Sequence, residues 1–169
     1  MSQAEGVQDG PKGLGGWLIL PMIGLVLSPV RMAIQFFTDL MPAFKSDVWH
    51  RINDTSLPGH QPMLPTLIVV ETAVNAVMFA FTLALIWYFV RKSRLAPRLY
   101  IAWLVLLVVI QVVDTAMVSS VGMPIDKESA RDLIRSVITA GIWIPYFLVS
   151  KRVKNTFVEP RLEDVARHF

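Results

Sequence analysis

Residues 64–90 read LPTLIVVETAVNAVMFAFTLALIWYFV, an apolar run in which Glu71 is the one charged side chain. A helix needs about 20 mainly apolar residues to cross about 30 Å of hydrocarbon, where only internal hydrogen bonds satisfy the backbone. This stretch is long enough and apolar enough to cross a bilayer. It therefore predicts a transmembrane helix and sets the class of the whole protein.

Three further apolar stretches of similar length accompany it, at about 14–37, 99–120 and 130–150. Of the 169 residues, 54% are hydrophobic and 17% are charged, a balance too apolar for a soluble domain of this size. We therefore expect an all-α polytopic membrane protein with four transmembrane helices in one bundle. Its parts are a cytoplasmic N-terminal segment (1–13), a transmembrane domain (14–150) with an outer loop (38–63), and a cytoplasmic tail (151–169).

The basic residues predict the orientation of these spans. The ends of the chain and the second connection carry ten of them, at Lys12, Arg91, Lys92, Arg94, Arg98, Lys151, Arg152, Lys154, Arg161 and Arg167. The other two connections carry four, at Lys45, Arg51, Lys127 and Arg131. Because cytoplasmic loops are enriched in Lys and Arg, both termini are expected in the cytoplasm. An even number of spans independently requires both termini on one side.

Aromatic residues near the predicted cytoplasmic ends of the spans are interpreted as interface anchors. They are Trp17, Trp87, Tyr88, Tyr100, Trp103 and Tyr146. In the outer loop, Phe44, Val48, Trp49 and Ile52 follow helical spacing. This pattern fits either a short helix lying on the outer membrane surface or an irregular loop with scattered apolar residues.

Each predicted span contains a charged residue in its outer half, together with polar residues three or four positions away. A charge at mid-membrane costs about 2.5 to 3.5 kcal/mol, so such residues usually face the bundle interior or form pairs. We hypothesise a network in which Glu71 and Asp114 face Arg31 and Arg135, since Arg matches a carboxylate bidentately. The full candidate set is Arg31, Gln35, Glu71, Asn75, Gln111, Asp114, Asp132 and Arg135.

Two other readings of these charges stay open. Arg31 and Arg135 have long stems and lie near the outer interface, so snorkelling to the headgroups explains them equally well. The short side chains of Glu71 and Asp114 favour an interior, paired position. Such pairing can fix helix register and need not serve transport.

Reactive chemistry is missing from the sequence. There is no cysteine, which excludes disulfides and thiolate chemistry. His50 and His60 share the outer loop without an obvious third ligand, so no metal site is expected. The short motifs of phosphate binding and hydrolysis are also absent. We assign no catalytic residue, metal or cofactor, and we expect neither an enzyme nor a nucleic-acid partner.

Three segments carry a family resemblance: GGWLIL at 15–20 with the following Pro21, the Glu71 to Asn75 stripe, and IWIPYFLVSKRVKNTF at 142–157. Together they resemble the DUF2569 family of bacterial inner-membrane proteins. The resemblance extends from Gly15 to about Phe157, and the C-terminal run is its most specific part. It implies a small multi-pass protein of the bacterial inner membrane without an established activity, so no site residue is carried over.

The basic run after the fourth span suggests contact with lipid. Lys151, Arg152 and Lys154 lie just beyond the predicted membrane boundary, where each basic residue near anionic headgroups contributes about 1 kcal/mol. The same residues also serve to enforce orientation, and both roles are compatible.

Three functions follow, in order of preference. The first is a non-enzymatic structural or accessory component of a membrane assembly, with membrane lipids and a protein partner or a second copy as its contacts. The alternative is a small transporter, channel or ion-coupled device that uses the buried Glu, Asp and Arg network. A lipid-modifying enzyme ranks last, because only Glu71, Asp114 and His50 offer acid or base groups.

Overall fold

The computed structural model describes residues 13–58, 60–120 and 127–157. Most of the predicted N-terminal segment, the end of the predicted tail from residue 158, and the connection 121–126 lie outside the described residues. Four helical stretches are long and apolar enough to cross a membrane, namely Gly16–Phe44, Leu64–Val90, Leu95–Ser120 and Ser129–Val149. They confirm the predicted all-α fold with four spans.

The first span is longer than the sequence predicted. It begins with a 3₁₀ turn at Gly16–Leu18 and continues as α1 (Ile19–Gln35). It then passes through a π turn (Phe36–Leu40) and a 3₁₀ turn (Met41–Phe44). Pro42 has no N–H to donate, so regular α bonding cannot continue through it. The hydrogen-bond pattern changes around this proline before the span ends.

A tight turn joins α3 (Leu64–Val90) to α4 (Leu95–Ser120). Lys92 adopts a left-handed conformation with φ of 53°. Its N–H donates to the carbonyl of Phe89, and the N–H of Ser93 donates to the carbonyl of Tyr88. This is the Schellman arrangement that satisfies carbonyls at a helix end. Ser93 then accepts from Leu95 N–H through its hydroxyl, which explains why α4 begins four residues before the predicted start.

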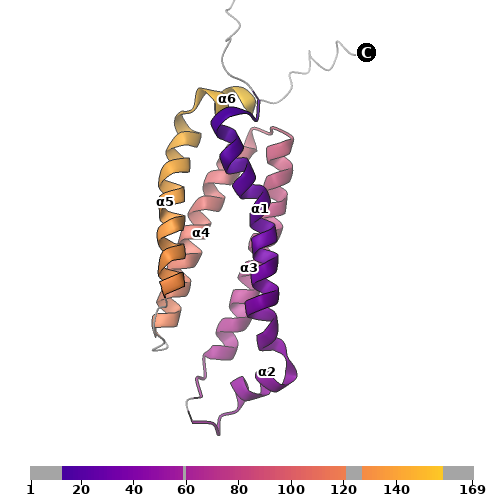
Figure 1. Cartoon of the computed structure of the whole chain (residues 1–169), viewed down its shortest axis with the longest axis vertical. Coiled ribbons are helices and arrows are strands. Elements are labelled where there is room, and N and C mark those ends of the chain that lie inside the picture. The colour runs from indigo at the N-terminus through magenta and orange to yellow at the C-terminus, as the bar shows by residue number, and fades with distance from the viewer. Residues whose placement is uncertain (1–12, 59, 121–126, 158–169) are drawn as a thin grey trace, which may run out of the picture.

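The four long helices form two pairs (Figure 1). α4 packs along α5 (Lys127–Val149), and α1 packs along α3. Contact between α3 and α4 joins the pairs. Figure 1 shows the pairs close together at the end that carries the short helix α6 (Lys151–Thr156) and diverging toward the end that carries α2 (Ser46–Asn53). We name these the α6 end and the α2 end.

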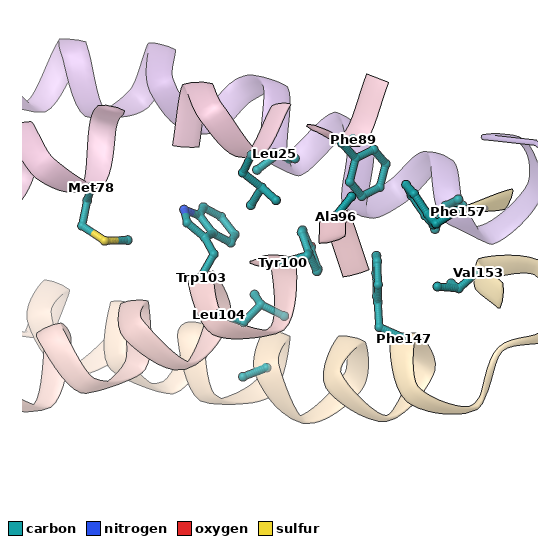
Figure 2. Packing of buried hydrophobic residues seen from close by; sticks show 13 residues of the cluster. Leu25, Met78, Phe89, Ala96, Tyr100, Trp103, Leu104, Phe147, Val153 and Phe157 are labelled. Carbon is teal, nitrogen blue, oxygen red and sulfur yellow. The ribbon is translucent and has the colours of Figure 1, made fainter. Parts of the chain in front are cut away.

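Nearly all buried side chains lie in the half of each helix nearer the α6 end, and Leu40 is an exception among the described residues. An aromatic cluster fills the centre of this core (Figure 2). Tyr100 stacks on Phe147 with ring centroids 4.4 Å apart, and Phe89 meets Phe157 edge to face at 4.9 Å. Such ring pairs contribute about 0.5–1.5 kcal/mol beyond their buried area. The core therefore holds the two pairs together at one end.

Two of the predicted interface anchors are core residues instead. Tyr100 is 2% exposed and Trp103 is 6% exposed. The indole N–H of Trp103 donates to the Thr82 hydroxyl at 2.9 Å, and that hydroxyl donates to the Met78 carbonyl at 2.7 Å. A buried indole needs such a partner, and Thr82 on α3 supplies it. By contrast, Trp17 is 72% exposed, as expected of an anchor.

The start of the predicted tail forms α6 and closes the α6 end. The Ser150 hydroxyl accepts from Val153 N–H and so caps the helix. Val153 and Phe157 are buried in the core. Thr156 bonds to the N–H and the carbonyl of Gly13, at 3.0 and 3.2 Å. The two ends of the described chain are thus tied together.

The outer loop contains a short helix, as one of the two sequence interpretations proposed. α2 packs against α3. Trp49 stacks on Phe44 with ring centroids 5.4 Å apart. Val48, Trp49 and Ile52 are half-buried, so the apolar face of α2 is partly covered by the bundle itself.

Candidate intramembrane polar site

The eight residues of the predicted network all lie in the half of the spans toward the α2 end, away from the core. Arg31 and Gln35 lie on α1, Glu71 and Asn75 on α3, Gln111 and Asp114 on α4, and Asp132 and Arg135 on α5. Those on α3 and α4 are half-buried, as is Asp132, whereas Arg31, Gln35 and Arg135 are exposed. The polar residues thus occupy the region where the helix pairs diverge.

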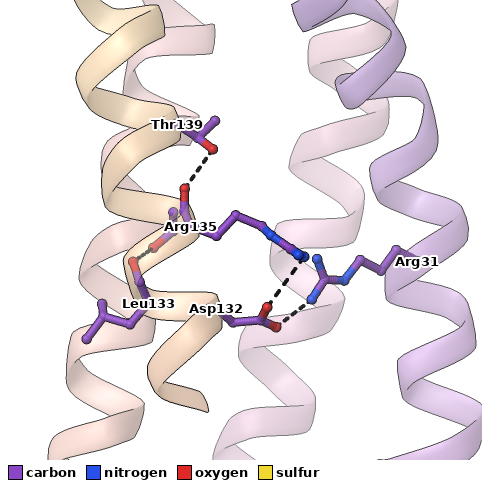
Figure 3. A network of polar contacts seen from close by, with 6 residues as sticks. Arg31, Asp132, Leu133, Arg135 and Thr139 are labelled. Carbon is purple, nitrogen blue, oxygen red and sulfur yellow. Dashed lines mark hydrogen bonds and ion pairs between the residues drawn. The ribbon is translucent and has the colours of Figure 1, made fainter. Parts of the chain in front are cut away.

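Asp132 is the centre of the ion pairs in this region (Figure 3). Its Oδ2 lies 2.5 Å from Nη2 of Arg31, and its Oδ1 lies 3.6 Å from Nη1 of Arg135. Arg31 reaches it from α1, whereas Arg135 is one turn away on α5 itself. We call Arg31, Asp132 and Arg135 the Asp132 cluster. It connects the two helix pairs across the diverging half.

This pairing differs from the predicted one, in which Glu71 and Asp114 face the two arginines. In the part of the chain that the structure describes, neither Glu71 nor Asp114 forms an ion pair. The physical reason is the placement of the helices. α1 faces α5 on the near side of Figure 1, whereas α3 and α4 lie behind them. Asp132 therefore lies closer to both guanidinium groups than either predicted carboxylate does.

Several polar side chains in the spans satisfy their hydrogen bonds on their own helix. The Asn75 amide donates to the Glu71 carbonyl at 3.0 Å, and the Thr115 hydroxyl donates to the Gln111 carbonyl at 2.8 Å. Thr139 does the same to the Arg135 carbonyl at 2.7 Å. Bonds of this kind to the carbonyl four residues earlier need no neighbouring helix. They account for the small polar residues but leave the two carboxylates unmatched.

The unmatched carboxylates form an acidic region behind the Asp132 cluster. The charges of Asp114 and Asp39 both act on Glu71, so each of these two acids lies within electrostatic range of Glu71. Among the described residues, no group of three acidic or histidine side chains is arranged to hold a metal ion. The region thus contains acidic groups that have no ion-pair partner among the described residues.

The three candidate headgroup residues have different surroundings. Lys151 and Lys154 on α6 are exposed. Arg152 is half-buried, because its guanidinium packs against Gly15 and Gly16. A Cβ at Gly16 would lie 3.1 Å from Cζ of Arg152, and Gly16 has φ of +61°. Glycine is therefore favoured at this position by its left-handed conformation, and a Cβ there would need the Arg152 guanidinium to shift slightly.

Sequence reasoning missed two polar contacts. The Thr82 and Trp103 bond joins residues that are 21 positions apart, and a Thr in an apolar helix gives no sign of a partner. The Arg31 and Asp132 pair spans 101 positions. Helical spacing places Asp132 on the same helix face as Arg135, but its partner on α1 depends on how the helices are arranged.

Four apolar spans with charged residues inside them define a small polytopic α-helical membrane protein. The chain belongs to the DUF2569 family, described as proteins of unknown function, whose family model matches residues 11–158. It is also similar to inner membrane protein YdgK of Escherichia coli (strain K12), with 25% identity over 152 residues that cover 89% of this chain and 97% of that protein. No solved structure matches the chain. The resemblance found in the sequence is confirmed, and the chain is an inner-membrane protein.

Proposed function

We propose that this protein is a non-enzymatic accessory component of an inner-membrane assembly, and that it binds a transmembrane helix of another chain through the acidic region on α3 and α4. The observation that carries this proposal is that Glu71 and Asp114 are partly buried inside predicted spans without an ion-pair partner among the residues described.

The energetics support a protein partner. A carboxylate at membrane depth costs a few kcal/mol unless it is paired or hydrated. Helices in membranes associate through packing and interhelical hydrogen bonds rather than through a hydrophobic driving force. A partner helix with a Lys, Arg or hydrogen-bond donor at the depth of Glu71 supplies the missing contact. The divergence of the helix pairs at the α2 end leaves this part of α3 and α4 outside the core.

The predicted orientation completes the proposal. With both termini in the cytoplasm, the acidic region lies in the periplasmic half of the membrane. Lys151 and Lys154 then face the cytoplasmic headgroups, together with Arg91, which lies 4.0 Å from the ring of Trp87. This arrangement is typical of a basic and aromatic anchor at the cytoplasmic interface.

Site-specific photo-crosslinking in cells tests the partner. A photoreactive residue replaces Val70 or Val113, which are exposed neighbours of Glu71 and Asp114, and in the control it replaces Leu148, which is exposed near the α6 end. We expect discrete adducts with a membrane protein or a second copy from the first two positions and not from the third. Glu71→Gln with Asp114→Asn weakens them. Equal adducts at all three positions, or no adduct at any, contradict the proposal.

A second candidate is a small ion-coupled transporter or channel. It is favoured by the placement of Asp39 and Asp114 within electrostatic range of Glu71, because clustered acids in a membrane attract a cation or proton. In proteoliposomes, this candidate predicts a cation or proton flux that falls in Glu71→Gln and in Asp114→Asn. Flux that is the same in wild type and both variants removes it.

A further inference from the structure

The Asp132 cluster carries a surplus of positive charge. Two guanidinium groups from α1 and α5 share one carboxylate, and Figure 3 shows the Arg31 side chain reaching it from α1 and the Arg135 side chain extending over it from α5. The contact with Arg31 is a close hydrogen bond, but Arg135 lies 3.6 Å from the carboxylate, beyond hydrogen-bond distance. Each guanidinium has five N–H donors. One carboxylate cannot satisfy ten donors, so most of them are available to a second acceptor.

These donors are open to their surroundings. The side chains of Arg31 and Arg135 are 59% and 62% exposed, whereas that of Asp132 is 26% exposed. The carboxylate is thus less exposed than the two guanidinium groups, which remain accessible to a further acceptor. An anion that approaches the cluster from outside the helix bundle therefore contacts the two arginines before it contacts Asp132.

The arginines of the cluster lie close enough to the membrane interface for their side chains to reach lipid phosphates. With about 1.5 Å of rise per residue, Arg31 lies about 21 Å along its helix from Trp17, and Arg135 lies about 24 Å from Lys151. In a hydrocarbon layer about 30 Å thick, both are within one or two turns of the interface at the α2 end. Long arginine stems extend over that remaining distance.

Apolar residues flank both arginines at the same spacing. Val30 and Ile34 are 55% and 58% exposed on either side of Arg31. Ile134 and Ile138 are 59% and 56% exposed on either side of Arg135. Each pair stands one position before and three positions after its arginine. The cluster is therefore bordered on both helices by surface suited to acyl chains.

We propose that Arg31 and Arg135 together bind the phosphate of a membrane phospholipid, in the leaflet at the α2 end, with its acyl chains on the flanks of α1 and α5. Arginine forks match phosphate oxygens bidentately, which a lysine does not do. The flanking apolar residues favour a lipid over a free phosphate ion. The site faces the α1 and α5 side, so it is separate from the partner contact proposed on α3 and α4.

Native mass spectrometry of the purified full-length protein in mild detergent tests this assignment with three probes: dioleoylphosphatidylglycerol, dioleoylglycerol and inorganic phosphate. We expect the phospholipid to bind with higher affinity than either of the other two. Equal binding of dioleoylglycerol shows that the phosphate is not recognised and overturns the proposal. Equal binding of inorganic phosphate overturns the assignment to a lipid.

Charge variants locate the site. We expect Arg31→Gln with Arg135→Gln to weaken phospholipid binding by about tenfold or more, since charge-assisted hydrogen bonds are lost. The matched control, Arg94→Gln with Arg98→Gln, removes two exposed arginines at the α6 end and is expected to leave this binding unchanged. An equal loss in both double variants indicates nonspecific attraction and contradicts the site.

Asp132→Asn is a further test, in which phospholipid binding is expected to become tighter instead of weaker. Removal of the carboxylate raises the net charge of the cluster from one to two and frees the donors that it occupied. We expect phospholipid to bind several-fold more tightly to this variant, because the competing anion is gone. Arg31→Lys with Arg135→Lys keeps the charge without the fork and is expected to bind with intermediate affinity. Weaker binding in Asp132→Asn than in wild type overturns the proposal.

Discussion

The indole N–H of Trp103 on α4 donates a 2.9 Å hydrogen bond to the hydroxyl of Thr82 on α3, and both side chains are buried. The same hydroxyl donates to the carbonyl of Met78 one turn earlier. This contact connects α3 to α4 inside the core at the α6 end. It is therefore a polar link between the two helix pairs where they lie close together.

Thr82→Val removes the acceptor of this bond and leaves the indole N–H of Trp103 unpaired. Because a buried donor without a partner costs about 1–3 kcal/mol, we expect a clear drop in the thermal unfolding temperature of the purified protein in detergent. Thr82→Ser keeps the hydroxyl and serves as the control. Equal unfolding temperatures for the Val and Ser variants would show that the bond does not contribute to stability.

Gly16→Ala is expected to destabilise the protein by about 1–2 kcal/mol, because an alanine at φ of +61° is strained and its Cβ meets Arg152. Gly24→Ala is the matched control in the same span, since a Cβ there has nothing within 4 Å. That change should be neutral or stabilising by up to about 1 kcal/mol, because Ala is the better helix former. Thermal unfolding of both variants in one detergent measures the difference. A Gly16→Ala protein as stable as Gly24→Ala would refute the close contact between Arg152 and the start of the first span.

Lys92→Gly should stabilise the turn between α3 and α4. Lys92 adopts the left-handed conformation with φ of 53°, which costs a non-glycine residue about 1 kcal/mol that glycine does not incur. We expect a gain of about 0.5–1 kcal/mol in unfolding free energy, measured by denaturant or thermal unfolding. Lys154→Gly, in the exposed face of α6, removes the same charge within a helix and should lower stability instead. A decrease in Lys92→Gly as well would show that the left-handed conformation at this position does not limit stability.

The absence of cysteine makes the orientation directly testable. Single cysteines replace Thr55 in the loop near α2 and Arg94 in the turn between α3 and α4, both of which are exposed. The positive-inside rule predicts that a membrane-impermeant thiol reagent labels Cys at 55 in intact spheroplasts, and labels Cys at 94 only after the membrane is opened. The reverse pattern would show that both termini face the periplasm.

Much of the fold follows from local features of the chain. The span predicted at 64–90 agrees with α3 at both ends. The span expected from residue 99 begins at Leu95, because the Lys92 and Ser93 turn allows an earlier start. The sequence does not predict α6, because its residues form a short polar run. This run is helical here because Ser150 caps it and because Val153 and Phe157 are buried in the core. Local pattern alone does not reveal such burial.

The candidate site was predictable in its residues but not in its pairing. The sequence places a charged residue at a similar depth on each span, and the structure positions all of them in the half toward the α2 end. Arg31 and Arg135 nevertheless meet Asp132, whereas Glu71 and Asp114 remain without ion-pair partners among the described residues. Helical spacing gives the depth of a side chain and its face on one helix. It does not give the rotation of that helix relative to its neighbours.

The sequence by itself determined the four membrane-spanning helices, because in hydrocarbon each helix must satisfy its own backbone hydrogen bonds and must be about 20 apolar residues long. Each segment meets this requirement on its own, so each span can be recognised from its own sequence. Only the tertiary structure decided that Tyr100 and Trp103 are buried, that α6 closes the core, and that Asp132 connects α1 to α5. These outcomes depend on which faces of separate helices meet, and the sequence of one helix does not determine that.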